Sequence, residues 1–147
     1  MSSPDGVRAW QAAIQVAVRT RKLVSRFPRR GYAELRDQMI RSSESIGHNI
    51  AEGNCSAFDR EYIRYLDTAA RSANELSSQL TTTLEYGIAP KWQVFNLNGT
   101  VICTRRMIES LRDAVKANYE AERARQRCAR RKPPRPRLGS RRPRKKG

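Results

Sequence analysis

Apolar residues recur along this chain at the three- and four-residue spacing that places them on one face of an α-helix. The pattern extends over four segments, and it predicts helices over residues 7–26, 32–52, 57–86 and 91–122. Helix-stopping residues separate these segments: Pro28 follows the first, Gly53 closes the second, and Gly87 and Pro90 follow the third. We therefore expect four helices joined by short connections.

The fourth segment contains a stretch of weak helical propensity. Its apolar stripe runs through Val94, Leu97, Val101, Ile108, Leu111 and Val115. Asn96, Asn98 and Gly99 fall within it, and a glycine inside a helix costs about 1 kcal/mol relative to alanine. The helix either tolerates this weak turn or begins at Asn98 as an N-cap residue. We favour the continuous helix; the apolar stripe keeps its register in both cases.

The pattern predicts a fold class as well as single helices. Alternation of apolar and polar residues nowhere persists beyond four or five residues, so no β-strand is predicted. Four amphipathic helices with short links bury their stripes by packing as antiparallel neighbours. We predict an all-α protein with an antiparallel up-down-up-down four-helix bundle over residues 1–122. Residues 123–147 form a basic C-terminal tail, and the prolines beyond Arg130 predict that it is disordered.

Positive charge is concentrated in the predicted tail. Residues 1–122 contain 17 basic and 14 acidic side chains, whereas residues 123–147 contain 13 basic side chains and no acidic one. The 13 are Arg123, Arg125, Arg127, Arg130, Arg131, Lys132, Arg135, Arg137, Arg141, Arg142, Arg144, Lys145 and Lys146. A block of like charge cannot collapse on itself and attracts a polyanion, so we predict that these residues bind nucleic acid. The alternative is that they only make the chain more soluble.

A second group of cations surrounds the predicted end of the first helix. Its six members are Arg19, Arg21, Lys22, Arg26, Arg29 and Arg30. They predict a basic patch on the bundle, which we assign to nucleic-acid binding together with the tail. The alternative is an ordinary solvated helix end, where cations are favoured by the negative end of the helix dipole.

The sequence offers little material for catalysis or for a cofactor. His48 lies three residues after Ser45 and four before Glu52, but a catalytic triad also needs an oxyanion donor and a shaped pocket, so we predict a non-enzymatic protein. One histidine and three cysteines without a C-x-x-C pair do not make a zinc site, and we expect no metal and no cofactor. Reduced cysteines, no secretory leader and no long apolar segment predict a cytoplasmic protein without a membrane span.

The small and polar residues of the second helix admit two interpretations. The residues in question are Arg41, Ser42, Asn49, Glu52 and Gly53. In the first, which we favour, the small residues Ser42, Ser45 and Gly47 let a neighbouring helix approach closely. A buried Asn49 then fixes the register of the two helices. In the second, Arg41, Asn49 and Glu52 form a subunit interface or a polar cluster that faces a ligand.

One segment of this helix is similar to a known family signature. The segment Gln38–Gly53, QMIRSSESIGHNIAEG, resembles the signature of the four-helix-bundle family named for the 23S rRNA intervening-sequence protein. Ala9–Gln11, Phe27–Pro28 and Glu61–Leu66 are also similar to that family, and the resemblance covers about residues 7–118. It implies the bundle fold more firmly than any activity, because the molecular function of most members is unsettled.

The resemblance also suggests partners. Related to this family are the accessory variability determinant proteins of diversity-generating retroelements, which are pentameric basic bundles that bind a reverse transcriptase and its template RNA. The basic tail makes the chain look more like those proteins than like its near-neutral relatives. The implied function is that of a homopentameric accessory protein whose partners are a reverse transcriptase and template RNA or cDNA. The alternative is a structural or ribosome-associated protein-interaction module with an incidental tail.

Overall fold

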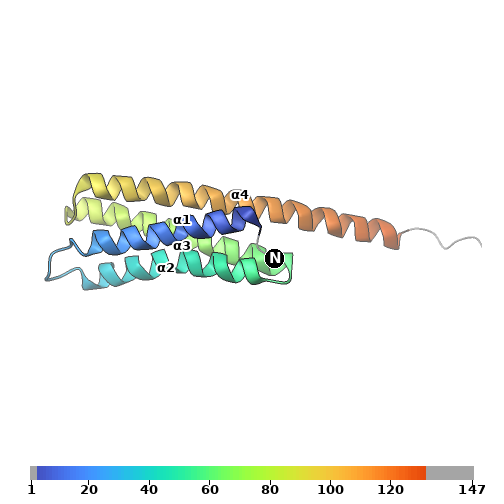
Figure 1. Ribbon diagram of the computed structural model, residues 1–147, viewed down its shortest axis with the longest axis horizontal. Coiled ribbons are helices and arrows are strands. Elements are labelled where there is room, and N and C mark those ends of the chain that lie inside the picture. Colours follow the sequence, from blue (N-terminus) through green and yellow to red (C-terminus); the bar gives the residue numbers. More distant parts are fainter. Residues whose placement is uncertain (1–2, 132–147) are drawn as a thin grey trace, which may run out of the picture.

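Four α-helices make up the described part of the protein. The computed structural model describes residues 3–131, with α1 at Pro4–Val24, α2 at Ala33–Cys55, α3 at Asp59–Tyr86 and α4 at Lys91–Arg130. Successive helices are antiparallel, and each helix packs against two others, α1 and α3 both lying beside α2 and α4 (Figure 1). The α1–α2 and α3–α4 connections lie at one end of the bundle and the α2–α3 connection at the other. The predicted all-α, up-down-up-down four-helix bundle is confirmed.

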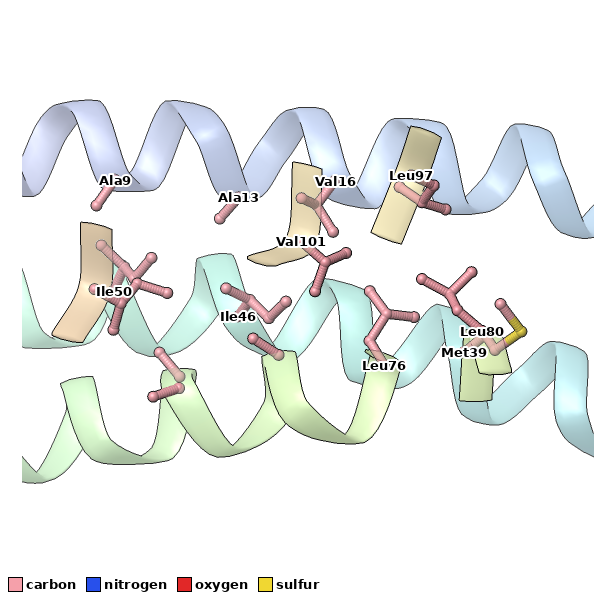
Figure 2. Close-up of a cluster of buried hydrophobic side chains, with 14 of the residues drawn as sticks. Ala9, Ala13, Val16, Met39, Ile46, Ile50, Leu76, Leu80, Leu97 and Val101 are labelled. Atoms are coloured by element: carbon pink, nitrogen blue, oxygen red, sulfur yellow. The ribbon is translucent and has the colours of Figure 1, made fainter. Parts of the chain in front are cut away.

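Aliphatic side chains from all four helices form one continuous core (Figure 2). Helix α1 contributes the small residues Ala9, Ala13 and Val16, which are almost completely buried and allow its backbone to lie close to its neighbours. The largest fully buried aliphatic side chains are Met39, Ile46, Ile50, Leu66, Leu76, Leu80 and Ile108. Removal of these side chains from water is the main favourable contribution to folding.

The buried threonines of the core bond to their own helix. Thr20 donates to the Val16 carbonyl oxygen at 2.8 Å, and Thr104 donates to the Thr100 carbonyl oxygen at 2.9 Å. Thr83 donates to the Gln79 carbonyl oxygen at 2.9 Å in the same way. Because each hydroxyl finds a partner one turn earlier, these threonines can be buried without the cost of an unsatisfied donor.

The end of α2 differs from the sequence prediction. We expected the helix to stop at residue 52 with Gly53 as a left-handed cap, but α2 continues to Cys55 and Gly53 does not have a positive φ. A Cβ atom at Gly53 would lie 2.7 Å from Cδ2 of the Tyr62 ring. The glycine is therefore needed because α3 approaches α2 closely here, and its backbone freedom is not used.

Tyr62 joins three helices at this end of the bundle. Its hydroxyl donates to Oδ1 of Asn54 at 2.6 Å, and a Cβ atom at Gly6 of α1 would lie 2.9 Å from the same hydroxyl. Burial raises the pKa of Tyr62; a side-chain hydrogen bond with Ser3 opposes this rise and the negative charge of Asp5 adds to it. The phenol is thus held in its neutral form between the helices.

Gly53→Ala is expected to lower the free energy of unfolding by about 1–3 kcal/mol, because the added methyl group meets the Tyr62 ring in a packed junction. Urea denaturation followed by circular dichroism measures this loss. Gly99→Ala is the matched control, since a Cβ atom at Gly99 meets nothing within 4 Å. There alanine is expected to stabilise α4 by about 0.5–1 kcal/mol through its higher helical propensity. Equal effects of the two substitutions would contradict this explanation of Gly53.

The other helix ends lie within a few residues of their predicted positions, apart from the end of α4. Helix α1 occupies Pro4–Val24 instead of 7–26, because the Ser3 side chain accepts the Gly6 N–H at 3.1 Å and starts the helix early. Helix α3 begins at Asp59 instead of 57 and ends before Gly87, which has a φ of 63° and is left-handed as a C-cap. Helix α4 runs through Asn96 and Gly99 without a break. No helix within residues 3–131 is long and apolar enough to cross a membrane.

Candidate nucleic-acid interface

Helix α4 extends past the rest of the bundle (Figure 1). The start of α3 lies beside Tyr119 and Glu122 of α4, because these two residues line a surface hollow together with residues 57–60. Residues 123–131 are all exposed. We call the helical segment Arg123–Arg130 the α4 arm. The prediction that the helix ends at residue 122 is wrong, because the first eight residues assigned to the tail continue α4.

The α4 arm is helical although none of the other three helices described packs against it. The last core residue of α4 is Leu111, and Val115 is half-buried, so hydrophobic contacts do not reach the arm. Extension of an existing helix adds one hydrogen bond per residue without a new nucleation cost, and Ala, Arg and Gln have high helical propensity. At the base of the arm, the Arg123 guanidinium lies 5.6 Å from the centroid of the Tyr119 ring, a cation–π contact.

The arm presents a row of positive charge. Residues 123–131 contain five arginines and no acidic side chain, namely Arg123, Arg125, Arg127, Arg130 and Arg131. At about 100° of rotation per residue, four of the five fall within about 100° of one another around the helix axis, and only Arg125 lies opposite. The row is about 12 Å long, at about 1.5 Å of rise per residue.

The remaining tail cations, Lys132, Arg135, Arg137, Arg141, Arg142, Arg144, Lys145 and Lys146, lie outside the described residues. The predicted disorder of the tail falls on the same part of the chain.

The six cations near the end of α1 do not form one patch. Arg21 turns toward α2, where its Nε and Nη2 both donate to Oε1 of Glu44, at 3.1 and 2.5 Å. Arg29 and Arg30 are exposed in the loop before α2. Only Arg19, Lys22 and Arg26 face α4. The structure therefore sorts these cations into one that is paired, two in the loop and three on the α4 side.

The three α4-facing cations line a groove between α1 and α4, which we call the α1–α4 groove. Its volume is about 390 Å³. From α4 it is lined by Trp92, Gln93, Asn96 and Leu97. Arg19 donates from Nη1 to Thr100 Oγ1 at 2.9 Å, which fixes the guanidinium beside α4.

Sequence reasoning did not single out Trp92, although a signal for it exists. Val94, Leu97 and Val101 account for the apolar stripe of α4, so a tryptophan at position 92 lies outside the stripe. Its side chain is 67% exposed. A large aromatic residue off the buried stripe, next in space to three cations, is the feature that marks the groove.

The polar residues of α2 do not form a single cluster. Ser42 and Gly53 are buried, while Arg41 and Glu52 are exposed and lie about 16 Å apart along the helix at about 1.5 Å per residue. The half-buried Asn49 donates from Nδ2 to the Ser45 carbonyl oxygen at 2.8 Å and to Ser45 Oγ at 3.1 Å. Ser45 Oγ is 2.9 Å from Ser72 Oγ on α3. Asn49 thus belongs to a short chain of hydrogen bonds that links α2 to α3.

His48 lies at the surface of the bundle. It is exposed and lines a shallow hollow with Trp10, Ile14 and Glu52 on the outer side of α1 and α2. Within residues 3–131 its ring makes no hydrogen bond to Ser45 or Glu52. In the same range, no group of three or more His, Cys, Asp or Glu side chains is placed to hold a metal ion.

Comparison with known proteins establishes the family. The family model described as "23S rRNA-intervening sequence protein" matches residues 6–110. The chain belongs to this family. None of the curated proteins compared with the chain matches it. The match includes the α1–α4 groove and the whole Gln38–Gly53 segment, whereas the α4 arm lies beyond its end.

A solved structure agrees with the fold of this 23S rRNA-intervening sequence protein family member. It is the crystal structure of a protein of unknown function from the S23 ribosomal protein family of Bacteroides thetaiotaomicron VPI-5482. The two chains are 21% identical with a TM-score of 0.67, and the similarity covers 74% of this chain and 98% of the other. At this identity the likeness supports the shared fold alone.

Proposed function

We propose that this protein is a non-enzymatic nucleic-acid-binding protein that contacts RNA phosphates through the α4 arm and the basic residues that follow it. The observation that carries the proposal is the arm itself. It is a helix of exposed arginines that projects beyond the bundle, contributes nothing to the core and forms no ion pair with any residue between 3 and 131. Such a surface is of little use for folding and fits a polyanion.

Contacts of this kind set affinity without reading a sequence. Phosphate contacts fix the position of a protein on nucleic acid, while specificity comes from base edges or from the shape of the nucleic acid. We therefore expect the arm to bind many RNAs with strong salt dependence. The experiment that tests the proposal is RNA affinity against salt for the full chain and for a chain that ends at Glu122.

We further propose that the RNA belongs to a diversity-generating retroelement and that a reverse transcriptase is the protein partner. The resemblance of Gln38–Gly53 and the strongly basic C-terminus support this proposal. Template RNA and its cDNA would both be bound through phosphates. Cys55, Cys103 and Cys128 are exposed free thiols, which supports action in the reducing cytoplasm.

The alternative is a structural or ribosome-associated interaction module. The name of the family refers to 23S rRNA, which favours this alternative. The genes that neighbour this one separate the two functions. A reverse transcriptase gene and a pair of repeats would support the retroelement accessory, whereas a location within an rRNA operon would support the ribosome-associated module.

We also propose that the protein assembles with copies of itself through α1, as a pentamer according to the resemblance. Val7, Trp10, Ile14 and Val18 follow one another at three- and four-residue intervals on the outer face of α1, and each is between 38 and 42% exposed. A row of four large apolar side chains on one face is typical of a protein–protein contact. In a ring, the basic surface of each subunit would repeat.

Ile14→Glu is expected to dissociate the assembly, because it places a charge in the centre of the apolar row and would bury that charge without a partner. The mass in solution, measured by light scattering, reports the change. Phe58→Glu is the control, since Phe58 is 72% exposed but lies outside α1. A wild-type protein that is monomeric, or an Ile14 variant with unchanged mass, would exclude this interface.

A further inference from the structure

The α1–α4 groove is positively charged and its charges are not cancelled. Its three cations, Arg19, Lys22 and Arg26, take part in none of the ion pairs formed within residues 3–131, and no acidic side chain lines the groove. The bond from Arg19 to the neutral Thr100 hydroxyl orients the guanidinium without removing its charge. Three cations that converge on a concave surface raise the local concentration of anions.

The α4 side of the groove, across from these cations, carries an aromatic ring that is not part of the core. Trp92 lies in the first turn of α4 and is 67% exposed, while Val94 and Leu97 occupy the buried positions beside it. A flat, exposed indole is suited to stacking with a nucleobase, which is how many proteins hold single-stranded nucleic acid. Trp92 therefore supplies the aromatic contact that a purely electrostatic surface lacks.

Two amide side chains in the groove can bond to the edge of a base. Gln93 and Asn96 line it next to Trp92. The Oε1 atom of Gln93 is buried and accepts no hydrogen bond from any residue between 3 and 131. Asn96 is exposed, so its amide can donate to and accept from a base edge, and rotation of the half-buried Gln93 side chain would present its unpartnered oxygen in the same way.

We propose that the α1–α4 groove binds one unpaired base of a single-stranded nucleic acid, stacked on Trp92, with the flanking phosphates held by Arg19, Lys22 and Arg26. A base within a duplex is stacked on its neighbours and does not reach the indole, so the groove selects single strands. This inference rests on the proposed nucleic-acid-binding function but uses a different surface. Trp92 and Arg123 are about 46 Å apart along α4, at about 1.5 Å per residue.

Tryptophan fluorescence tests the groove directly. The sequence contains two tryptophans, so Trp10→Phe in the full chain leaves Trp92 as the single reporter. The probe is an oligo(U) RNA of about ten nucleotides, added at about 50 mM salt. Saturable quenching of Trp92 is expected with this RNA, and binding without quenching is expected with an RNA duplex of the same length.

Substitution measures the contribution of the ring. Trp92→Ala is expected to lower the affinity for oligo(U) by about five- to 150-fold, while Trp92→Tyr retains a stacking face and most of the affinity. Phe95→Ala is the control, because Phe95 is 61% exposed one turn away but does not line the groove. Its affinity is expected to match that of the wild-type protein.

The outcomes separate this proposal from the proposed function. One outcome is salt-sensitive RNA binding that does not quench Trp92 fluorescence and is not weakened by Trp92→Ala. It would overturn the proposed role of the groove and leave the α4 arm as the binding surface. Failure of the full chain to bind any RNA at about 50 mM salt would overturn both the groove proposal and the proposed nucleic-acid-binding function. Equal quenching by a polyglutamate peptide would show that the groove binds acidic peptides, and would overturn its assignment to nucleic acid.

Discussion

A chain that ends at Glu122 is expected to lose most of its affinity for RNA. The truncation removes 13 cations and no acidic residue, and residues 1–122 keep a balance of only +3. If the full chain neutralises six to ten phosphates, its affinity falls by about 10³- to 10⁵-fold between 50 and 200 mM salt. The truncated chain is expected to bind weakly at 50 mM and to show a shallow salt dependence. Fluorescence anisotropy with a labelled single-stranded RNA measures both slopes.

A second truncation separates the α4 arm from the cations that follow it. A chain that ends at Arg131 keeps the five arginines of residues 123–131 and lacks the other eight basic residues. Its salt slope is expected to lie between those of the other two chains. If it binds like the chain that ends at Glu122, the arm makes no contribution. If the full chain does not bind at 50 mM, the nucleic-acid proposal is wrong and the bundle is a protein-interaction module.

Neither truncation is expected to disturb the bundle, so a difference in RNA affinity reports the contribution of the residues removed. Residues 123–131 are exposed and lie beyond Leu111, the last core residue of α4. Their removal exposes no apolar side chain of the core. Thermal unfolding monitored by circular dichroism is therefore expected to show the same midpoint for the full chain and for both truncated chains.

The fold could be predicted from the sequence because each helix carries its own apolar stripe. The periodicity depends only on residues of one helix, and helices with one apolar face have few ways to bury it. The end of α2 shows the limit of this reasoning. Gly53 suggested a helix cap, yet it is helical, and its function is to leave room for Tyr62 of the next helix. Such a contact between two helices produces no periodic pattern in the sequence of either helix.

The length of α4 was mispredicted for a related reason. An apolar stripe indicates where a helix is buried, and it ends near Val115, but it does not indicate where the helix itself ends. Backbone hydrogen bonds and residue propensity continue α4 to Arg130 without any burial. Packing therefore ends near Val115, before the change of composition at residue 123, and the helix itself continues to Arg130.

The sequence shows where the basic residues are, but it does not show which of them are paired and which are free to meet a ligand. Arg19, Arg21 and Lys22 look alike along the chain, and only the packing of α1 against its neighbours distinguishes them. Arg21 meets Glu44 of α2, whereas Arg19 and Lys22 face Trp92 of α4. The charge available to a ligand thus depends on helix register, which is set by core contacts far apart in sequence.

Met39→Ala is expected to lower the free energy of unfolding by about 2–5 kcal/mol. Met39 of α2 is completely buried among core side chains that include Leu80 (Figure 2). Its sulfur lies 3.5 Å from the Thr83 hydroxyl, but that hydroxyl also donates to the Gln79 carbonyl oxygen. The substitution therefore leaves no unsatisfied donor, and the loss reflects the cavity and the lost burial of the side chain.

Met107→Ala provides the matched control for this effect, because the same atoms are removed from a side chain that is 38% exposed. A surface position of this kind is expected to change stability by about 0.5 kcal/mol or less. Urea denaturation of both variants at equal protein concentration measures the difference. A Met39 variant no less stable than the Met107 variant would show that α2 and α3 are not packed in this register. Because the orientation of α2 also places Glu44 beside Arg21 of α1, that result would remove the basis for sorting the α1 cations.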